Sequence, residues 1–167
     1  MEHARLFEFE SDFVATLRCI PMSVRFKLDR VGVKLTLRQW SRFTHEDRER
    51  LLHQPCETED DIATYRARLV DLVALRAGEQ AKALAEPPDE AWRDKSATPP
   101  AVVRRSANVG LSPPTADEWS GLSDIERFVL LKLSRDNHDN VNFAPALREF
   151  GLRPGADATK LGAASGG

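Results

Sequence analysis

The sequence contains two stretches that align without a gap, TLRQWSRFTHEDRERLL at residues 36–52 and TADEWSGLSDIERFVLL at residues 115–131. In each stretch a Thr precedes a short segment with one Trp, and a Thr or Ser then precedes a segment that ends in Leu-Leu. Because Thr and Ser ahead of a helix accept hydrogen bonds from its first N–H groups, each stretch predicts a helix–turn–helix corner. We therefore expect two copies of one corner, with Trp40 and Trp119 both buried. The alternative is that capped corners of this kind recur by chance.

An acid at the third position of the second segment predicts how each corner is closed. Ser123 and Glu126 have the spacing of a capping box, in which the Glu side chain bonds back to the N–H group of the cap residue. Asp47 has the same spacing from Thr44. Its side chain is one methylene shorter, so we expect the box at Thr44 to stay open.

Helical patterns extend from the corners in both directions. Apolar residues recur at spacings of three and four over 24–31 and over 58–84, whereas 87–114 contains three Pro-Pro pairs. The predicted fold is mostly α: a compact multi-helix bundle of short capped helices, with one long central helix over 58–84 and a short extended N-terminal arm at 6–10. We expect a single domain over 1–152, with a Pro-rich connecting region at 86–114 inside it. A Gly- and Ala-rich tail over 153–167 is expected to be disordered.

The composition excludes several classes of protein. The chain has 167 residues, of which 41% are hydrophobic and 30% charged, and its formal net charge is −2. It has no apolar run near the roughly 18 residues that a membrane-spanning helix needs, and no secretory signal at its start. Two cysteines are too few for a disulfide scaffold. We expect a cytoplasmic protein with reduced thiols and no membrane partner.

Basic residues are concentrated between positions 18 and 42. Seven cations face one acid there, a net charge of +6, and the cations are Arg18, Arg25, Lys27, Arg30, Lys34, Arg38 and Arg42. Such a patch suits an acidic protein surface or an anionic cofactor. Residues 43–61 carry seven acids and two Arg, which would repel a phosphate backbone, so no nucleic-acid partner is expected. The alternative is a solvated helix face that these acids partly neutralise.

No motif for catalysis or metal binding is present. The chain lacks G-x-S-x-G, P-loop and dinucleotide-binding patterns, and Cys19, Cys56, His53 and His138 lack the spacing of a metal site. The richest polar cluster is the run at 134–143, between two predicted helices. Asp, Asn and His there fit either a simple linker or a binding loop.

Several stretches resemble the nitrate-reductase-associated protein family. They lie at 7–13, 17–22, 25–29, 32–35, Trp40, 131–135, His138, 142–143 and 145–152. The resemblance covers nearly all of residues 6–152, and 17–22 and 142–152 are its most specific parts. It implies a small protein found with assimilatory nitrate reductase in nitrate-using bacteria, which supports the activity or maturation of that molybdenum enzyme. It does not imply catalysis.

The sequence therefore predicts a non-catalytic accessory factor that binds nitrate reductase or its assembly intermediate. It needs no cofactor or metal of its own, and the oligomeric state is left open. The expected partner-binding residues are the seven cations at 18–42 together with Arg135, His138 and Asn142. Two alternatives are a thiol-based redox protein that uses Cys19 and Cys56, and a carrier of an anionic cofactor.

Overall fold

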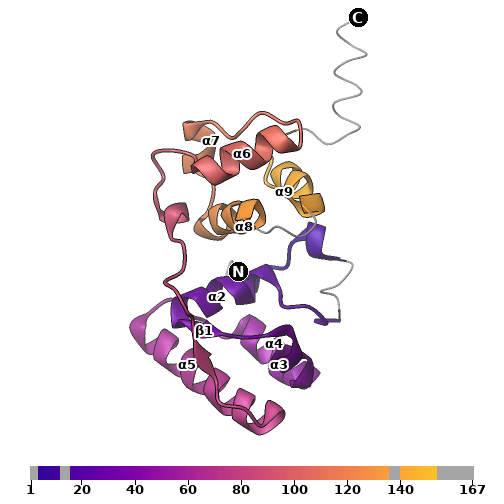
Figure 1. Cartoon of the computed structure of the whole chain (residues 1–167), viewed down its shortest axis with the longest axis vertical. Helices are drawn as coiled ribbons and strands as arrows, with labels where there is room; N and C mark the ends of the chain where they lie inside the picture. Colours follow the sequence, from indigo (N-terminus) through magenta and orange to yellow (C-terminus); the bar gives the residue numbers. More distant parts are fainter. Residues whose placement is uncertain (1–3, 12–15, 136–139, 154–167) are drawn as a thin grey trace, which may run out of the picture. The chain divides into compact units, whose positions relative to one another are not determined.

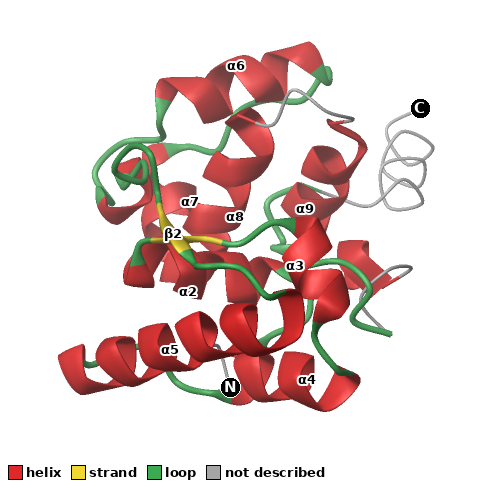
Figure 2. Cartoon of the chain, turned by 60° about the horizontal axis from the view of Figure 1, so that its bottom comes forward, coloured by secondary structure: helices red, strands yellow, loops and turns green. Residues whose placement is uncertain are grey.

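The computed structural model describes residues 4–11, 16–135 and 140–153 of the chain. Its contacts divide the chain into an N-terminal unit, Met1–Asp89, and a C-terminal unit, Glu90–Gly167. The boundary falls next to Pro87 and Pro88, the first proline pair. Helices make up most of both units, as Figure 1 and Figure 2 show, so the prediction of a mostly α fold is confirmed. A single domain over 1–152 stays a prediction.

In the described part of the N-terminal unit, the main elements are the helices α2, α3, α4 and α5. Its elements are η2 (Glu8–Glu10), α2 (Met22–Val31), β1 (Val33–Lys34), α3 (Leu37–Arg42), α4 (His45–His53), α5 (Glu59–Leu72), the π-helical η3 (Val73–Ala77) and β2 (Lys82–Ala83). Helix α2 contacts both α4 and α5. Gly32 ends α2 with a φ of 70°, a conformation that glycine adopts without strain, as its place in the sequence predicts.

The first corner has the predicted helix caps at Thr36 and Thr44, and the capping box at Thr44 is closed, which was not predicted. Thr36 and Gln39 close a capping box at the start of α3. At the start of α4 the Asp47 carboxylate accepts from the Thr44 N–H group at 2.9 Å, while the Asp47 N–H donates to Thr44 Oγ1 at 3.0 Å. The expectation that Asp47 is too short was therefore wrong. Asp61 closes the same box on Thr58 at the start of α5, so an Asp carboxylate reaches across this turn.

The long helix is shorter than the sequence pattern predicts. We expected helix to Leu84, but α5 and η3 end at Gly78, which has a φ of 65°. Lys82 and Ala83 then form β2, which pairs antiparallel with β1 in the register Val33↔Ala83 and Lys34↔Lys82. Positive φ at Gly78 stops the helix and turns the chain back along β1.

The core of the N-terminal unit joins all of its helices. Its large fully buried side chains include Trp40 of α3, Leu51 of α4, and Tyr65 and Leu69 of α5. Leu17 is buried beside them with a φ of 55°, a conformation that costs about 1–2 kcal/mol for a residue with a Cβ atom. Its carbonyl oxygen accepts from Trp40 Nε1 at 2.8 Å and from an Arg48 guanidinium nitrogen at 3.3 Å. These bonds hold the turn that enters α2.

The C-terminal unit contains the second corner. Its elements are η4 (Ala91–Arg93), α6 (Pro100–Asn108), α7 (Ala116–Gly121), α8 (Asp124–Arg135), η5 (Asn140–Asn142) and α9 (Phe143–Glu149). Helix α8 is the centre of the unit and contacts η4, α6 and α9. Its apolar face is almost continuous, with Ile125 and the run 128–131 buried.

The two corners match in detail. Thr115 with Glu118, and Ser123 with Glu126, form the capping boxes of α7 and α8. Trp119 is fully buried, as Trp40 is, and its indole N–H donates to the Asp94 carbonyl at 2.8 Å, the same length as the bond from Trp40 to Leu17. Each unit therefore contains one copy of the predicted corner, and in both copies the tryptophan is buried and bonds to a main-chain carbonyl outside the corner.

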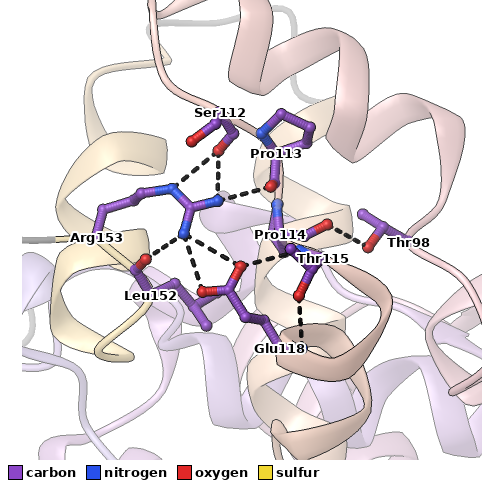
Figure 3. A network of polar contacts seen from close by, with 8 residues as sticks. All are labelled: Thr98, Ser112, Pro113, Pro114, Thr115, Glu118, Leu152 and Arg153. Carbon is purple, nitrogen blue, oxygen red and sulfur yellow. Dashed lines mark hydrogen bonds and ion pairs between the residues drawn. The ribbon is translucent and has the colours of Figure 1, made fainter.

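Arg153 fastens the end of the described chain onto the second corner (Figure 3). Its guanidinium donates to the carbonyls of Ser112 and Pro113 at 2.7 and 2.6 Å, and to the Glu118 carboxylate at 3.1 Å. Glu118 simultaneously accepts from the Thr115 N–H group at 2.9 Å. The rest of the predicted disordered tail, 154–167, lies outside the described residues.

Candidate partner-binding surfaces

The basic segment at 18–42 divides into cations that the fold uses and cations that it leaves exposed. Arg18, Lys34 and Arg42 are exposed, and none of them forms a hydrogen bond or ion pair with another residue that the structure describes. Arg18 precedes α2, Lys34 lies in β1, and Arg42 is the last residue of α3. These three side chains are the cations of the segment that the described fold leaves exposed and without a bonding partner.

Lys27 does not belong to that surface, which corrects the expectation from its charge. Its side chain is only 4% exposed, and its ammonium group donates to the carbonyls of Leu52 and Gln54 at 2.6 and 2.7 Å. It lies 5.7 Å from the centre of the Tyr65 ring, whose hydroxyl donates to the Leu51 carbonyl. Lys27 therefore caps the C-terminal end of α4 from inside the core. Burial lowers its pKa to about 8.

Three further cations of the segment form hydrogen bonds or an ion pair within the N-terminal unit. Arg25 donates through Nε to the Ile20 carbonyl, and Arg30 donates to the Cys56 carbonyl while lying over the Phe26 ring. Arg38 pairs with Glu79 at 2.8 Å, although 70% of its side chain is exposed. The main-chain bonds of Arg25 and Arg30 fix the positions of their guanidinium groups but do not neutralise the positive charges.

The small sheet adds a cation that the charge pattern at 18–42 does not include. Lys82 lies opposite Lys34 in the β1–β2 ladder, and both residues are exposed. Like charges directly opposite each other destabilise a strand pair, so this pair favours an anionic neighbour over bare solvent. Only the register of two strands 48 positions apart brings these lysines together, and sequence spacing gives no signal for that.

The other predicted partner-binding residues, Arg135, His138 and Asn142, lie in the C-terminal unit, and the structure describes two of them. Arg135, the last residue of α8, lines a groove of about 540 Å³ together with Ala101, Arg104, Arg105, Ala107, Asn108 and Ser134. His138 lies outside the described residues. Asn142 is half-buried ahead of α9 and makes no side-chain cap for that helix. The predicted residues do not include Arg104 and Arg105, although two adjacent arginines in the segment that forms α6 could have indicated them.

A groove of similar volume, about 530 Å³, lies between the end of α4 and the start of α5. Its lining mixes the cations Arg50 and Arg68 with the acid Asp61, and it includes His53, Gln54, Pro55 and Thr64. Arg68 donates to the Gln54 side chain within it. The Asp61 carboxylate therefore offsets only part of the positive charge of this groove.

The surroundings of Cys56 disfavour a reactive thiol. Both cysteines are free; Cys56 is buried and Cys19 is half-buried. Burial raises the pKa of the Cys56 thiol, which disfavours the reactive thiolate. Among the residues that the structure describes, no three His, Cys, Asp or Glu side chains gather as metal ligands would.

Fold and surface together define a small helical protein that offers arginine and lysine side chains at two separate places. Its family is shown by the sequence: the model of the conserved nitrate reductase-associated protein family (Nitr_red_assoc) matches residues 6–150. The chain belongs to that family. No curated protein and no solved structure matches it significantly. None of the helices in the described part of the chain has the length and apolar character needed to cross a bilayer.

Proposed function

We propose that this protein is a non-catalytic accessory factor that binds an assimilatory molybdenum nitrate reductase or an assembly intermediate of it. Membership of a family described by association with nitrate reductase supports the choice of partner. The proposal places the protein in the cytoplasm and gives it the task of supporting the activity or maturation of the reductase.

The observation that carries the proposal is the set of exposed cations Arg18, Lys34 and Arg42. Cations that stabilise a fold bond to it, as Lys27 and Arg48 do, whereas these three bond to no other described residue. Charges at the rim of an interface steer association and select complementary partners more than they raise affinity. We therefore expect an acidic surface on the reductase to meet these side chains.

A nucleic-acid partner fits the N-terminal unit less well. Exposed acids follow the basic segment closely, with Glu46 and Glu49 on α4 and Glu59 and Asp60 at the start of α5. A phosphate backbone that contacts several cations would also meet these carboxylates. A folded partner with a local acidic patch avoids them.

The test is co-purification of nitrate reductase with tagged protein from nitrate-grown cells. The decisive variant is Arg18→Glu with Arg42→Glu, because neither side chain bonds to the described fold. A matched control is Lys95→Glu with Arg148→Glu, two exposed residues of the C-terminal unit that change the net charge equally. The proposal predicts capture by the wild type and the control and loss of capture by the decisive variant. Equal capture by all three proteins would show that this surface is not the binding site.

A further inference from the structure

We propose that the exposed face of the ribbon formed by β1 and β2 is part of the contact with the reductase, where Lys34 and Lys82 together bind a carboxylate of an acidic segment of that partner. The inference rests on the proposed function and adds to it Lys82, a residue far from the basic segment at 18–42. Both strands lie within the described part of the N-terminal unit (Figure 2).

The alternation of side chains along the strands turns both lysines outward. Val33 is buried, and Leu35 and Ala81 pack against the core of the N-terminal unit. Successive side chains of a strand point to opposite faces, so Lys34 and Lys82 lie on the face away from that core, where both are exposed. Directly opposite residues of an antiparallel ladder have Cβ atoms about 4.5–5.5 Å apart. Two ammonium groups on such a pair can donate to the two oxygens of one carboxylate.

The positive charge of the lysine pair is not neutralised within the described part of the chain. Glu79, the acid nearest to Lys82 in the sequence, is held by Arg38 at 2.8 Å and by the Gln39 amide at 3.2 Å. Glu86, the next nearest acid, bonds to neither lysine. The residues two positions before and after each lysine carry no charge; they are Gly32, Thr36, Gln80 and Leu84.

A third cation adds positive charge beside the start of the ribbon. Arg66 of α5 is exposed, and its Nε donates at 2.8 Å to the carbonyl of Val31, the last residue of α2. This bond fixes the guanidinium without neutralising its charge. Exposed charges of this kind select a partner with complementary charge and steer its approach. An acidic segment with more than one carboxylate therefore matches this surface better than a single anionic group.

The lysine pair also carries a cost to the fold, which provides a second measurable effect. Like charges directly opposite each other destabilise a strand pair. Lys82→Gln removes this repulsion and keeps a polar side chain at an exposed position, so it should not lower the urea midpoint of unfolding. A loss of reductase binding in a variant that is at least as stable as the wild type cannot be caused by unfolding.

The test is the affinity of the full chain for purified nitrate reductase, measured by biolayer interferometry. We expect Lys82→Gln to weaken binding about threefold, and Lys34→Gln with Lys82→Gln to weaken it about tenfold. The matched control is Lys95→Gln with Arg148→Gln, two exposed residues of the C-terminal unit that change the net charge equally. It should bind as the wild type does. Urea unfolding of the same proteins should show midpoints of the ribbon variants at or above that of the wild type.

The outcomes separate this inference from the proposed function. If the wild type binds and the double variant of Lys34 and Lys82 binds equally well, or no worse than the control, the inference is overturned and the proposed function stands. If the wild type does not bind, both are overturned. A response of the two lysines to inorganic phosphate in an NMR titration, combined with reductase binding that is unchanged in the double variant, would identify a small anion as the occupant and would also overturn the inference.

Discussion

Arg48 and Arg127 occupy matched positions in the two corners, and each holds the end of the helix that carries the tryptophan. Arg48 donates to the carbonyls of Trp40 and Ser41 at 3.1 and 3.0 Å. Arg127 donates to the Leu122 carbonyl, to the Trp92 carbonyl at 2.8 Å and to Asp124. The carbonyls at the end of a helix lack partners within it, so a guanidinium there supplies the missing donors. Arg127 does this while almost fully buried.

The difference in burial predicts different costs for removing the two arginines. Arg127→Met leaves buried carbonyls without a donor and should lower the free energy of unfolding by about 3 kcal/mol. Arg48→Met should cost only about 1 kcal/mol, because water reaches its half-buried partners. Urea unfolding followed by circular dichroism measures both, with the exposed Arg148→Met as control. Arg127→Met as stable as the control would refute the structural role.

The lowered pKa of Lys27 predicts that the free energy of unfolding depends on pH in the alkaline range. Its pKa is about 8 in the folded protein and 10.5 in the unfolded chain. Between these values the unfolded chain holds the proton that the folded protein has lost. Rising pH therefore favours the folded state in this window, by at most about 1.4 kcal/mol per pH unit.

The comparison of wild type with Lys27→Met isolates this contribution from other groups that titrate at alkaline pH. The stability of the wild type relative to the variant should be constant below pH 8 and should rise above it. Urea unfolding at a series of pH values provides the data. A flat difference up to pH 10.5 would mean that the pKa of Lys27 is not lowered.

The two thiols should react at different rates. Iodoacetamide should modify half-buried Cys19 first and buried Cys56 only when the protein unfolds, because burial raises the pKa of the Cys56 thiol. Mass spectrometry of peptides from the native and urea-unfolded protein locates the label. Rapid labelling of native Cys56, or a Cys19–Cys56 disulfide under mild oxidation, would support the redox alternative.

Arg153 should contribute to the lowered pKa of Glu118, together with the larger effect of the Thr115 N–H group. The Glu118 carboxylate accepts from the Thr115 N–H group and from Arg153, and these bonds lower its pKa despite partial desolvation. Arg153→Ala should move the pKa of Glu118 towards its ordinary value, as followed by carboxyl-carbon NMR during an acid titration. Arg148→Ala, which changes the same charge away from Glu118, should not move it. Equal pKa values in wild type and Arg153→Ala would mean that the contact is not formed in solution.

Local sequence pattern was enough to predict the corners and most of the caps. Thr36, Thr115 and Ser123 cap helices because their side chains bond to main-chain groups three residues away, an interaction that depends only on nearby residues. Gly78 shows the limit of periodicity. Apolar spacing continues past it, but its positive φ ends the helix and the strand pairing of Lys82 replaces further helix.

Contacts between residues far apart in the sequence determine which cations are exposed at the surface. Local sequence pattern does not indicate these contacts. Lys27 and Arg25 are two positions apart on one helix, yet only the Lys27 side chain points at the end of α4. The groove at Arg135 likewise depends on the packing of α6 against α8. Charge counted along the chain therefore found the basic region but misassigned one of its members and missed Lys82, Arg104 and Arg105.

Exposed cations of the N-terminal unit are expected to bind nitrate reductase, and the affinity of the protein for purified reductase measures this binding. Biolayer interferometry at two salt concentrations should show binding of the wild type that weakens with salt, because exposed charges are screened. Arg18→Glu with Arg42→Glu should slow association and weaken affinity about tenfold or more, while Lys95→Glu with Arg148→Glu should behave as the wild type. An affinity that neither salt nor the Arg18 and Arg42 reversals change, or no binding of the wild type, would show that these cations do not bind the reductase.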